Sequence, residues 1–234
     1  MCGPLLTHVC GPRWTIQEAA EQSVAAPTMA AALDARYISG RKSEREAASK
    51  ILEAPTEIPS VAQEQIISDL GQALYASKIC SYAQGLNVIK AASEEKKWGV
   101  DLSECARIWQ GGCIIRAQML GPITNAFKKD PNLANLMVDS DFAADLNRRH
   151  MAWRRIVTLC VASGVPCPSF SASLCYFDSY RRAKLPANLT QAQRDYFGGH
   201  TYERTDMEGT HHCQWTDAHK EVIGNINERN AGNL

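Results

Sequence analysis

Apolar residues recur at three- and four-residue steps along most of the chain, the spacing of one face of an α-helix. The longest such stretch runs from residue 60 to about residue 95. Ser60 followed by Gln63 forms a capping-box pattern at its start. A helix of this length crosses the whole core of a globular domain. Its apolar positions are Ile67, Leu70, Leu74, Ile79, Tyr82, Leu86 and Ile89.

Two shorter helices are predicted before this stretch. Thr15 and Glu18 form a capping box that opens a helix towards Ile38, and Pro27 should kink or interrupt it. Residues 43–52 are rich in alanine and charged residues and predict a second helix. A short proline-bracketed linker then leads to the long helix.

Further helices are predicted after it. Asp101 and Glu104 cap a helix that leads into residues 109–116, where paired glycines permit close packing or a break. His150–Ala162 is amphipathic, and the aromatic-rich residues 169–184 are also helical in pattern.

The last predicted helix is short. Thr190 and Gln193 form a capping box at its start, and Gly198-Gly199 should end it after about two turns. The apolar period fades after that helix, so Thr201–Leu234 is predicted to be an extended tail with one short helix near Ala218–Ile226. No hairpin and no alternation of strands with helices is predicted. The expected fold class is therefore all-α.

Composition narrows the classes of function. The 234 residues are 45% hydrophobic and 21% charged, which is typical of a globular protein. Lys+Arg and Asp+Glu both number 25, so the chain has no net charge that would attract it to nucleic acid or to a membrane surface. No apolar run approaches the roughly 20 residues of a membrane span, and the first 14 residues do not form a signal peptide. A cytoplasmic protein is expected.

Cysteine and histidine patterns do not predict a metal site. The nine cysteines are irregularly spaced without a CxxC pair, so reduced thiols in the core are expected. A cluster of possible metal ligands near the C-terminus consists of His211, His212, Cys213 and His219. Its spacing matches no zinc site, so the cluster is expected to lie in a solvated tail.

An anion-binding site is predicted around the last helix. Arg194 lies on that helix and His200 follows its glycine exit, so a stiff element and a flexible loop present a guanidinium and an imidazole. Such a pair suits a phosphate or a carboxylate. The alternative is an arginine that caps a neighbouring carbonyl beside a structural histidine. The 234 residues contain no GxGxxG, P-loop, GxSxG or HExxH motif.

Several sequence blocks resemble the C-terminal all-helical domain of the decarboxylating 6-phosphogluconate dehydrogenase family. WQGGCIIR and QAQRDYFGGHTYE are the longest of them, and the resemblance covers roughly residues 13–215. The blocks occur in the family's order: Trp14–Ala19, Ala35-Arg36, Leu74–Lys78, Ser81–Gly85, Trp109–Arg116, Ser169–Tyr180, Leu185–Ala187 and Gln191–Glu203.

The resemblance implies an activity. Family members are homodimers of the pentose phosphate pathway and of gluconate utilisation. They oxidise 6-phosphogluconate with NADP, and the 3-keto acid then loses CO2 to give ribulose 5-phosphate. The family's lysine base and glutamic acid proton donor have no counterpart in these residues, and neither does its Rossmann domain. No catalytic residue and no cofactor-binding residue is therefore assigned here, and the isolated chain is expected to be inactive.

Three substrate-binding residues follow from the resemblance. Arg36 and Arg194 match arginines that hold the substrate phosphate, and His200 matches a contact to a substrate hydroxyl. In the family, the segment with Arg194 and His200 crosses to complete the site of the partner subunit. The local sequence alone predicts a surface salt bridge for Arg36.

The resemblance also divides the chain. Residues 1–12 match nothing in the family, and Val9 and Gly11 stand where the family has a lysine and a threonine, so a mis-joined start or a truncated gene model is expected. Residues 13–200 are the expected substrate and dimerisation domain, and residues 201–234 the tail.

Two classes of function remain open. The chain is either the substrate-completing part of the enzyme or a non-catalytic helical module that dimerises with or regulates a full-length copy. The wider β-hydroxyacid dehydrogenase group is a weaker alternative, because its substrates need not carry a phosphate.

Overall fold

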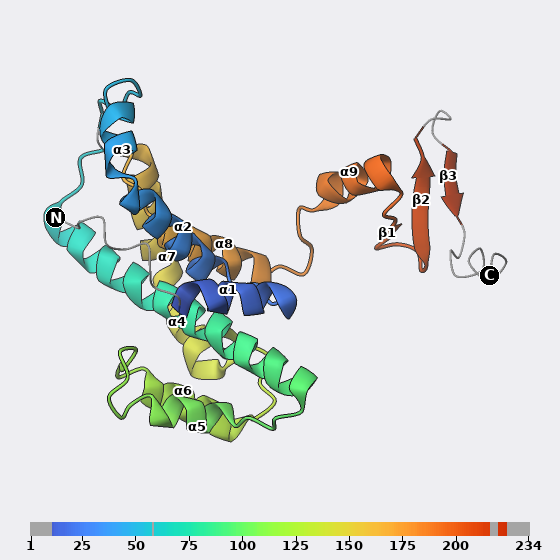
Figure 1. Cartoon of the computed structure of the whole chain (residues 1–234), viewed down its shortest axis with the longest axis horizontal. Coiled ribbons are helices and arrows are strands. Elements are labelled where there is room, and N and C mark those ends of the chain that lie inside the picture. Colours follow the sequence, from blue (N-terminus) through green and yellow to red (C-terminus); the bar gives the residue numbers. More distant parts are fainter. Residues whose placement is uncertain (1–10, 58, 216–219, 224–234) are drawn as a thin grey trace. The chain divides into compact units, whose positions relative to one another are not determined.

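The computed structural model describes residues 11–57, 59–215 and 220–223. The chain divides into two compact units, Met1–Tyr180 and Arg181–Leu234 (Figure 1). The division lies between Tyr180 and Arg181, so the last helix groups with the tail, whereas the sequence pattern placed the boundary at residue 200.

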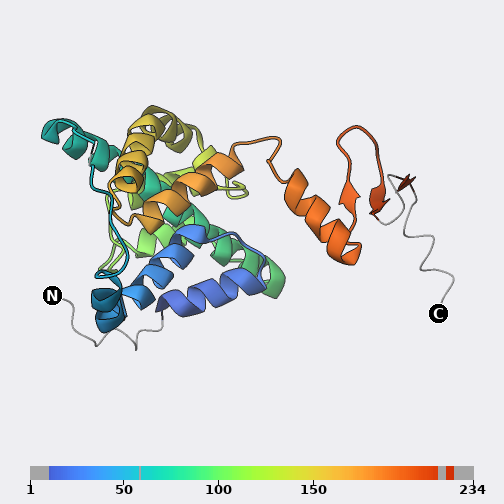
Figure 2. The same ribbon diagram turned by 90° about the horizontal axis from the view of Figure 1, so that it is seen from above.

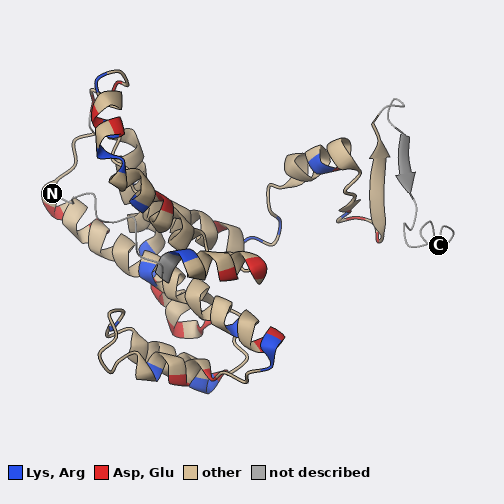
Figure 3. Cartoon of the chain, viewed as in Figure 1, with Lys and Arg blue, Asp and Glu red and all other residues tan. Residues whose placement is uncertain are grey.

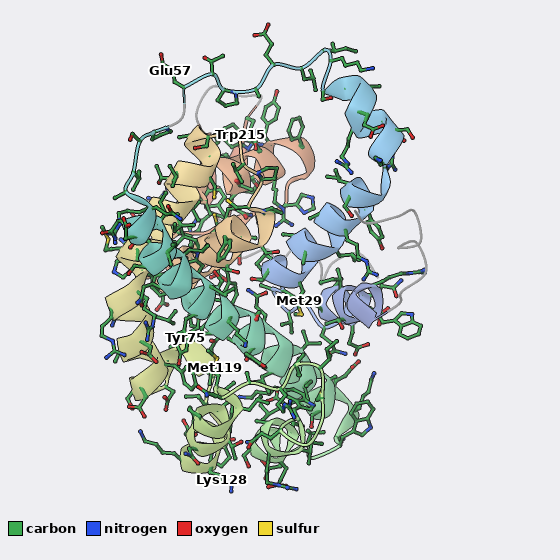
Figure 4. All side chains as sticks on the ribbon, turned by 90° about the vertical axis from the view of Figure 1, so that its left-hand side faces the viewer. Met29, Glu57, Tyr75, Met119, Lys128 and Trp215 are labelled. Atoms are coloured by element: carbon green, nitrogen blue, oxygen red, sulfur yellow. The ribbon has the colours of Figure 1, made fainter. Side chains whose placement is uncertain are left out.

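The first unit is helical and is built around α4, the expected long helix. Helix α7 packs along α4, α8 packs against α2 and α4, and α5 pairs with α6. Side chains of α4 and its neighbours fill the space between the ribbons (Figure 4). The elements are α1 (Gly11–Glu21), α2 (Pro27–Gly40), α3 (Lys42–Ala48), α4 (Gln63–Lys96), α5 (Leu102–Ile108), α6 (Leu120–Lys129), the 3-10 helix η2 (Leu136–Val138), α7 (Ser140–Ala162) and α8 (Pro168–Tyr180).

Helix starts differ from the capping patterns in all but one case. Thr15 lies inside α1, because Pro12 already suits a first helical turn, where its missing N–H costs nothing. Helix α4 begins at Gln63 without a side-chain cap. Asp101 does cap α5, accepting hydrogen bonds from the backbone N–H groups of Ser103 and Glu104. The expected interruption at Pro27 is confirmed, since α2 begins there.

Alanines of α4 supply much of the close packing in the helical core. Ala73, Ala76 and Ala83 are fully buried, which lets neighbouring helices approach α4 closely. Trp153 of α7 is also fully buried, and its indole N–H donates to the carbonyl of Phe170 at 3.1 Å. Arg155 of α7 forms a bidentate ion pair with Asp69 in the first half of α4, and both contacts are 2.7 Å.

A polar link joins α2, α4 and α8 inside this core. Gln84 is fully buried, accepts a hydrogen bond from the backbone N–H of Thr28 at 3.0 Å and donates to the Thr28 hydroxyl at 2.8 Å. That hydroxyl lies 2.7 Å from the hydroxyl of Ser173. The three side chains satisfy one another, which is what a polar group needs when it leaves water.

The cysteines are only partly the core thiols that were expected. Cys80 is buried, and burial raises the pKa of its thiol to about 12. The remaining described cysteines are half-buried, except for the exposed Cys175, and none of the described cysteines forms a disulfide. Cys2 and Cys10 lie outside the described residues.

The second unit consists of α9 (Asn188–Gly198) and a small sheet. The sheet consists of β1 (Tyr202–Glu203), β2 (Thr210–Gln214) and β3 (Lys220–Ile223), which are antiparallel in the order β1-β2-β3. Figure 2 shows the strands as arrows that follow α9. In the register of the first pair, His211 of β2 lies opposite Tyr202. Within residues 201–215 and 220–223, the predictions of an extended tail without a hairpin and of a helix near Ala218–Ile226 are wrong. The rest of both predicted segments lies outside the described residues. Strand β2, THHCQ, lacks alternating apolar residues, so its local pattern does not identify it as a strand.

The all-α class is confirmed for the helical domain, and the sheet is an addition to it. The prediction for residues 1–12 falls mostly outside the described residues. Across the described part of the chain, no helix combines the length and the apolar character needed to cross a bilayer. Lys and Arg are interspersed with Asp and Glu along the helices (Figure 3).

Replacing Gln84 tests the polar link. Gln84→Leu leaves the backbone N–H of Thr28 without a partner, so the free energy of unfolding should fall by about 2 kcal/mol. Urea unfolding of the purified chain measures this loss. Gln63→Leu on the exposed first turn of α4 is the matched control and should change stability little. Equal unfolding midpoints for the two variants would show that the link contributes nothing.

Candidate functional site

A buried carboxylate, that of Asp195, organises the second unit. Its side chain is fully buried on α9. Oδ1 accepts a hydrogen bond from the backbone N–H of Thr201 at 2.9 Å and lies 2.7 Å from Nδ1 of His212. Oδ2 accepts from the backbone N–H of Cys213 at 2.9 Å and from the indole N–H of Trp215 at 3.0 Å. One carboxylate therefore joins α9, its exit loop and β2.

The hydrogen bonds keep this carboxylate ionised. Burial is the largest influence and by itself raises the pKa of Asp195. The hydrogen bonds from His212, Cys213, Trp215 and Thr201 together outweigh burial, and the pKa lies below its usual value. The charge is thus compensated by its donors, although no lysine or arginine pairs with it among the described residues.

The exit of α9 turns sharply back on the helix. Gly199 ends the helix in the left-handed conformation, with φ of 62°, and its N–H donates to the carbonyl of Asp195 at 2.9 Å. This confirms the predicted stop at Gly198-Gly199. The helix begins before Thr190, at Asn188, so the predicted capping box is wrong.

His200 lies over the end of the helix. A Cβ added to Gly198 would lie 3.1 Å from both Cδ2 and Nε2 of the His200 ring, so a larger residue there would displace the ring by a few tenths of an ångström. His200 and Arg194 are both exposed. The imidazole and the guanidinium therefore face solvent from α9 and its exit, as the sequence predicted for these two residues.

Arg36 belongs to the other unit. It lies half-buried in the second half of α2. Among the described residues no acidic side chain pairs with Arg36 or Arg194, and no backbone carbonyl accepts a hydrogen bond from the Arg194 side chain. Neither the surface salt bridge nor the carbonyl-capping arginine is therefore found there. The structure places Arg194 on α9, His200 just past the end of α9, and Arg36 on α2 of the other unit.

A cavity of about 630 Å³ opens in the helical unit between α1, α4 and the segment 109–116. The hydroxyl of Tyr82 on α4 donates to the carbonyl of Ile115 and fixes that segment over the helix. The wall is mostly apolar, and its charged side chains are those of Lys78, Arg116 and Glu18. Arg36 does not line this cavity.

The expected solvated cluster is partly ordered. His211 is buried, His212 contacts Asp195, and Cys213 lies in β2, so the prediction of a solvated tail is wrong for these residues. No group of histidine, cysteine and acidic side chains within the described ranges could hold a metal ion. His219 lies outside those ranges.

The residues that sequence reasoning missed are those that hold the site. Gln191 and Asp195 belong to the same sequence block as Arg194. They are four residues apart, so they form a polar stripe on one face of the helix, and this spacing is the signal that could have identified them. Their partners in β2 are far along the chain, so no local pattern connects them.

Acid should loosen the second unit through Asp195. Because its folded pKa lies below its unfolded value of about 3.9, the carboxylate stabilises the unit above that pH and loses this contribution as pH falls through the folded pKa. The indole N–H resonance of Trp215, followed by NMR, should change below about pH 4. Asp195→Asn should abolish the transition. A midpoint near pH 6 in the wild-type chain would instead assign the transition to a histidine.

The space over Gly198 can be tested by adding one methyl group. Gly198→Ala should displace the His200 ring and shift its imidazole NMR resonances. Gln193→Ala, at an exposed position of the same helix, is the control and should leave the His200 resonances unchanged. Equal shifts of the His200 resonances in both variants would contradict the close approach.

Comparison with known proteins agrees with this architecture. The family model described as "6-phosphogluconate dehydrogenase, C-terminal domain" matches residues 10–215. The chloroplastic decarboxylating 6-phosphogluconate dehydrogenase 2 of Spinacia oleracea is 54% identical over 221 residues, covering 92% of this chain and 41% of the relative. The decarboxylating 6-phosphogluconate dehydrogenase 1 of Oryza sativa subsp. japonica is 58% identical over 205 residues, and the match covers 87% of this chain and 42% of the relative.

A solved structure shares the fold. It is the Plasmodium falciparum 6-phosphogluconate dehydrogenase, described in its apo form, with its cofactor NADP+ and with its substrate 6-phosphogluconate. The TM-score is 0.81 and the sequence identity is 46%. The superposition covers 87% of this chain and 44% of the Plasmodium falciparum chain. The chain spans less than half the length of the relatives it matches. It belongs to the 6-phosphogluconate dehydrogenase family and corresponds to that family's C-terminal domain.

Proposed function

We propose that this chain forms the substrate-binding and dimer-forming part of a cytoplasmic, NADP-dependent, decarboxylating 6-phosphogluconate dehydrogenase of the pentose phosphate pathway. The observation that carries the proposal is the exposure of Arg194 on α9 and of His200 on the exit loop that Asp195 holds. Neither side chain pairs with an acidic side chain among the described residues. Arg36, which also lacks an acidic partner among the described residues, is the third member of the proposed site.

The substrate chemistry fits these side chains. A phosphate dianion held by two guanidinium groups is a charge-assisted arrangement, and the planar fork of arginine matches its oxygens. In the proposed enzyme Arg36 and Arg194 hold the phosphate of 6-phosphogluconate, and His200 binds a hydroxyl of the sugar acid. This fixes the end of the substrate remote from its carboxylate, which leaves the carboxylate end free to react.

The reaction follows from the family. Oxidation of the substrate at C3 places a carbonyl β to the carboxylate, so the electrons released with CO2 pass into an enediol that becomes ribulose 5-phosphate. The 234 residues contain no glycine-rich turn of the kind that holds a dinucleotide pyrophosphate. No residue of this chain is therefore assigned to NADP, and its own side chains serve to bind and orient the substrate.

An exposed apolar surface supports a homodimer with tail exchange. In the described part of the second unit no apolar side chain is buried, while α9 presents large apolar groups to solvent. Tyr196 contacts Phe197 and Trp215 edge to face, at ring-centroid separations of 5.4 and 5.6 Å. Such a surface, with Leu189 beside it on α9, gains burial when a second copy of the chain covers it.

Binding of 6-phosphogluconate to the purified chain tests the proposed site. Arg194→Lys should raise the dissociation constant about tenfold, since lysine cannot reproduce the bidentate fork. Isothermal titration calorimetry measures the change. Arg107→Lys, at an exposed arginine paired with Glu104 on α5, is the matched control and should leave binding unaltered. Absence of any binding by the wild-type chain in its dimeric form would favour the non-catalytic module.

Mixed dimers test the shared site. In an equimolar mixture of Arg36→Ala and Arg194→Ala chains, about half of the dimers are mixed, and each mixed dimer holds one intact and one doubly altered site. About a quarter of all sites should then bind 6-phosphogluconate with wild-type affinity. Neither parent variant should bind this tightly. If the mixture binds no better than the two parents, the two arginines do not come from different subunits.

A further inference from the structure

The loop that carries His200 has an unusual backbone. Gly199 and Thr201, the residues on either side of His200, both have positive φ, 62° and 59°. Glycine adopts this conformation freely, but threonine is β-branched and is strained there. A strained backbone of this kind persists only where its surroundings hold it, and it occurs most often at functional sites.

Two side chains of α9 hold the strained residue. Asp195 accepts a hydrogen bond from the backbone N–H of Thr201 at 2.9 Å. The side-chain amide of Gln191 donates to the carbonyl of Thr201. Gln191 and Asp195 are four residues apart, so they lie on the same face of α9. Both backbone polar groups of Thr201 are therefore bound to the helix, and His200 is confined between this anchor and Gly199.

The Asp195 carboxylate, which binds Thr201, is itself held in place by several hydrogen bonds. All four hydrogen bonds to Asp195 come from groups outside α9, and three of them come from β2 and the residue that follows it. The carboxylate has no exposed surface and both of its oxygens are occupied. It has little freedom to rotate, so the position of Thr201 is fixed relative to α9.

The contacts of Asp195 fall into two sets. The hydrogen bonds from Cys213 and Trp215 to Oδ2, with the contact of His212 to Oδ1, join α9 to β2 and the residue that follows it. The hydrogen bond from the backbone N–H of Thr201 to Oδ1 acts on the loop instead. Its direct effect, together with that of Gln191, is on the path of the chain at His200.

We infer that Gln191 and Asp195 are positioning residues that hold Thr201 and so fix the His200 imidazole for a sugar hydroxyl of the substrate. The inference rests on the proposed function of His200. It adds to that function two residues that touch no substrate. Their role is to keep the His200 ring over Gly198, beside the helix that carries Arg194.

Gln191→Met is the sharpest test, because it removes the donor to Thr201 at nearly constant size and leaves every contact of Asp195 in place. Two quantities are measured on the full chain: the dissociation constants of 6-phosphogluconate and inorganic phosphate, and the hydrogen-exchange protection of the Thr201 amide. Binding of 6-phosphogluconate should weaken about fivefold or more, and Thr201 protection should fall. Binding of inorganic phosphate, which has no sugar hydroxyl, should change less than twofold.

Gln193→Met is the matched control, since Gln193 is exposed on the same helix. It should change neither affinity nor protection. Asp195→Asn should reproduce the effect of Gln191→Met on the ratio of the two affinities, with a loss of stability in addition.

A double-mutant cycle separates positioning from general stability. In a His200→Ala background, Gln191→Met should cause no further loss of 6-phosphogluconate affinity, because the group that it positions is gone. Losses that simply add would overturn the inference, as would unchanged 6-phosphogluconate binding in Gln191→Met alone. A wild-type chain that binds no 6-phosphogluconate would instead overturn the proposed function, and the inference with it, whatever the protection of Thr201.

Discussion

The second unit depends on the burial of one negative charge. Removing a carboxylate from water costs several kcal/mol unless hydrogen bonds replace its hydration. Asp195 obtains these bonds only when the exit loop, strand β2 and the indole that follows it meet α9 together. The requirement for donors is therefore a constraint on backbone geometry. Since adjacent residues on a helix point about 100° apart, burying Asp195 also turns Arg194 away from the network and towards solvent.

The helical unit is stabilised in a different way. Its core is a continuous set of apolar side chains around α4, and the polar groups inside it, such as Gln84 and Thr28, satisfy one another. In the described part of the second unit only Asp195 and His211 are buried. One unit is thus held by packing, which tolerates small adjustments. The other is held by directional hydrogen bonds, which fix positions closely but supply little apolar burial.

Sequence patterns predicted those features of the helices that depend only on residues close together in the chain. The extent of α4, the cap at Asp101, the break at Pro27 and the glycine stop of α9 each depend on a few adjacent positions, and all were predicted. Periodicity predicted only part of the covered face, where Ile79 and Leu86 are fully buried. Ile67, Leu70 and Leu74 carry the helical period, yet they are exposed, while small alanines of the same helix are buried.

The sheet and the carboxylate network could not be read from local patterns. His212 and Cys213 were expected to be solvated because β2 has no apolar alternation. Their positions are set by Asp195, which is 17 and 18 residues away along the chain. Arg194 and His200 were identified from the short helix with its glycine exit and from the family block that contains them. Gln191 and Asp195 stand in the same block, but they act on His200 through the backbone of Thr201, which no local pattern marks.

The proposed dimer connects these two kinds of stability. The unit that carries Arg194 and His200 has the better-defined hydrogen bonds but the smaller apolar core, and its large apolar groups, including Tyr196 and Phe197, are exposed on the helix that carries the site. Covering them with a second subunit adds the apolar burial that the network lacks. The same contact would bring Arg194 towards the Arg36 of another copy. In the proposed enzyme, substrate binding and subunit association therefore depend on the same helix, and the hydrogen bonds of Asp195 fix the exit loop and β2 on that helix.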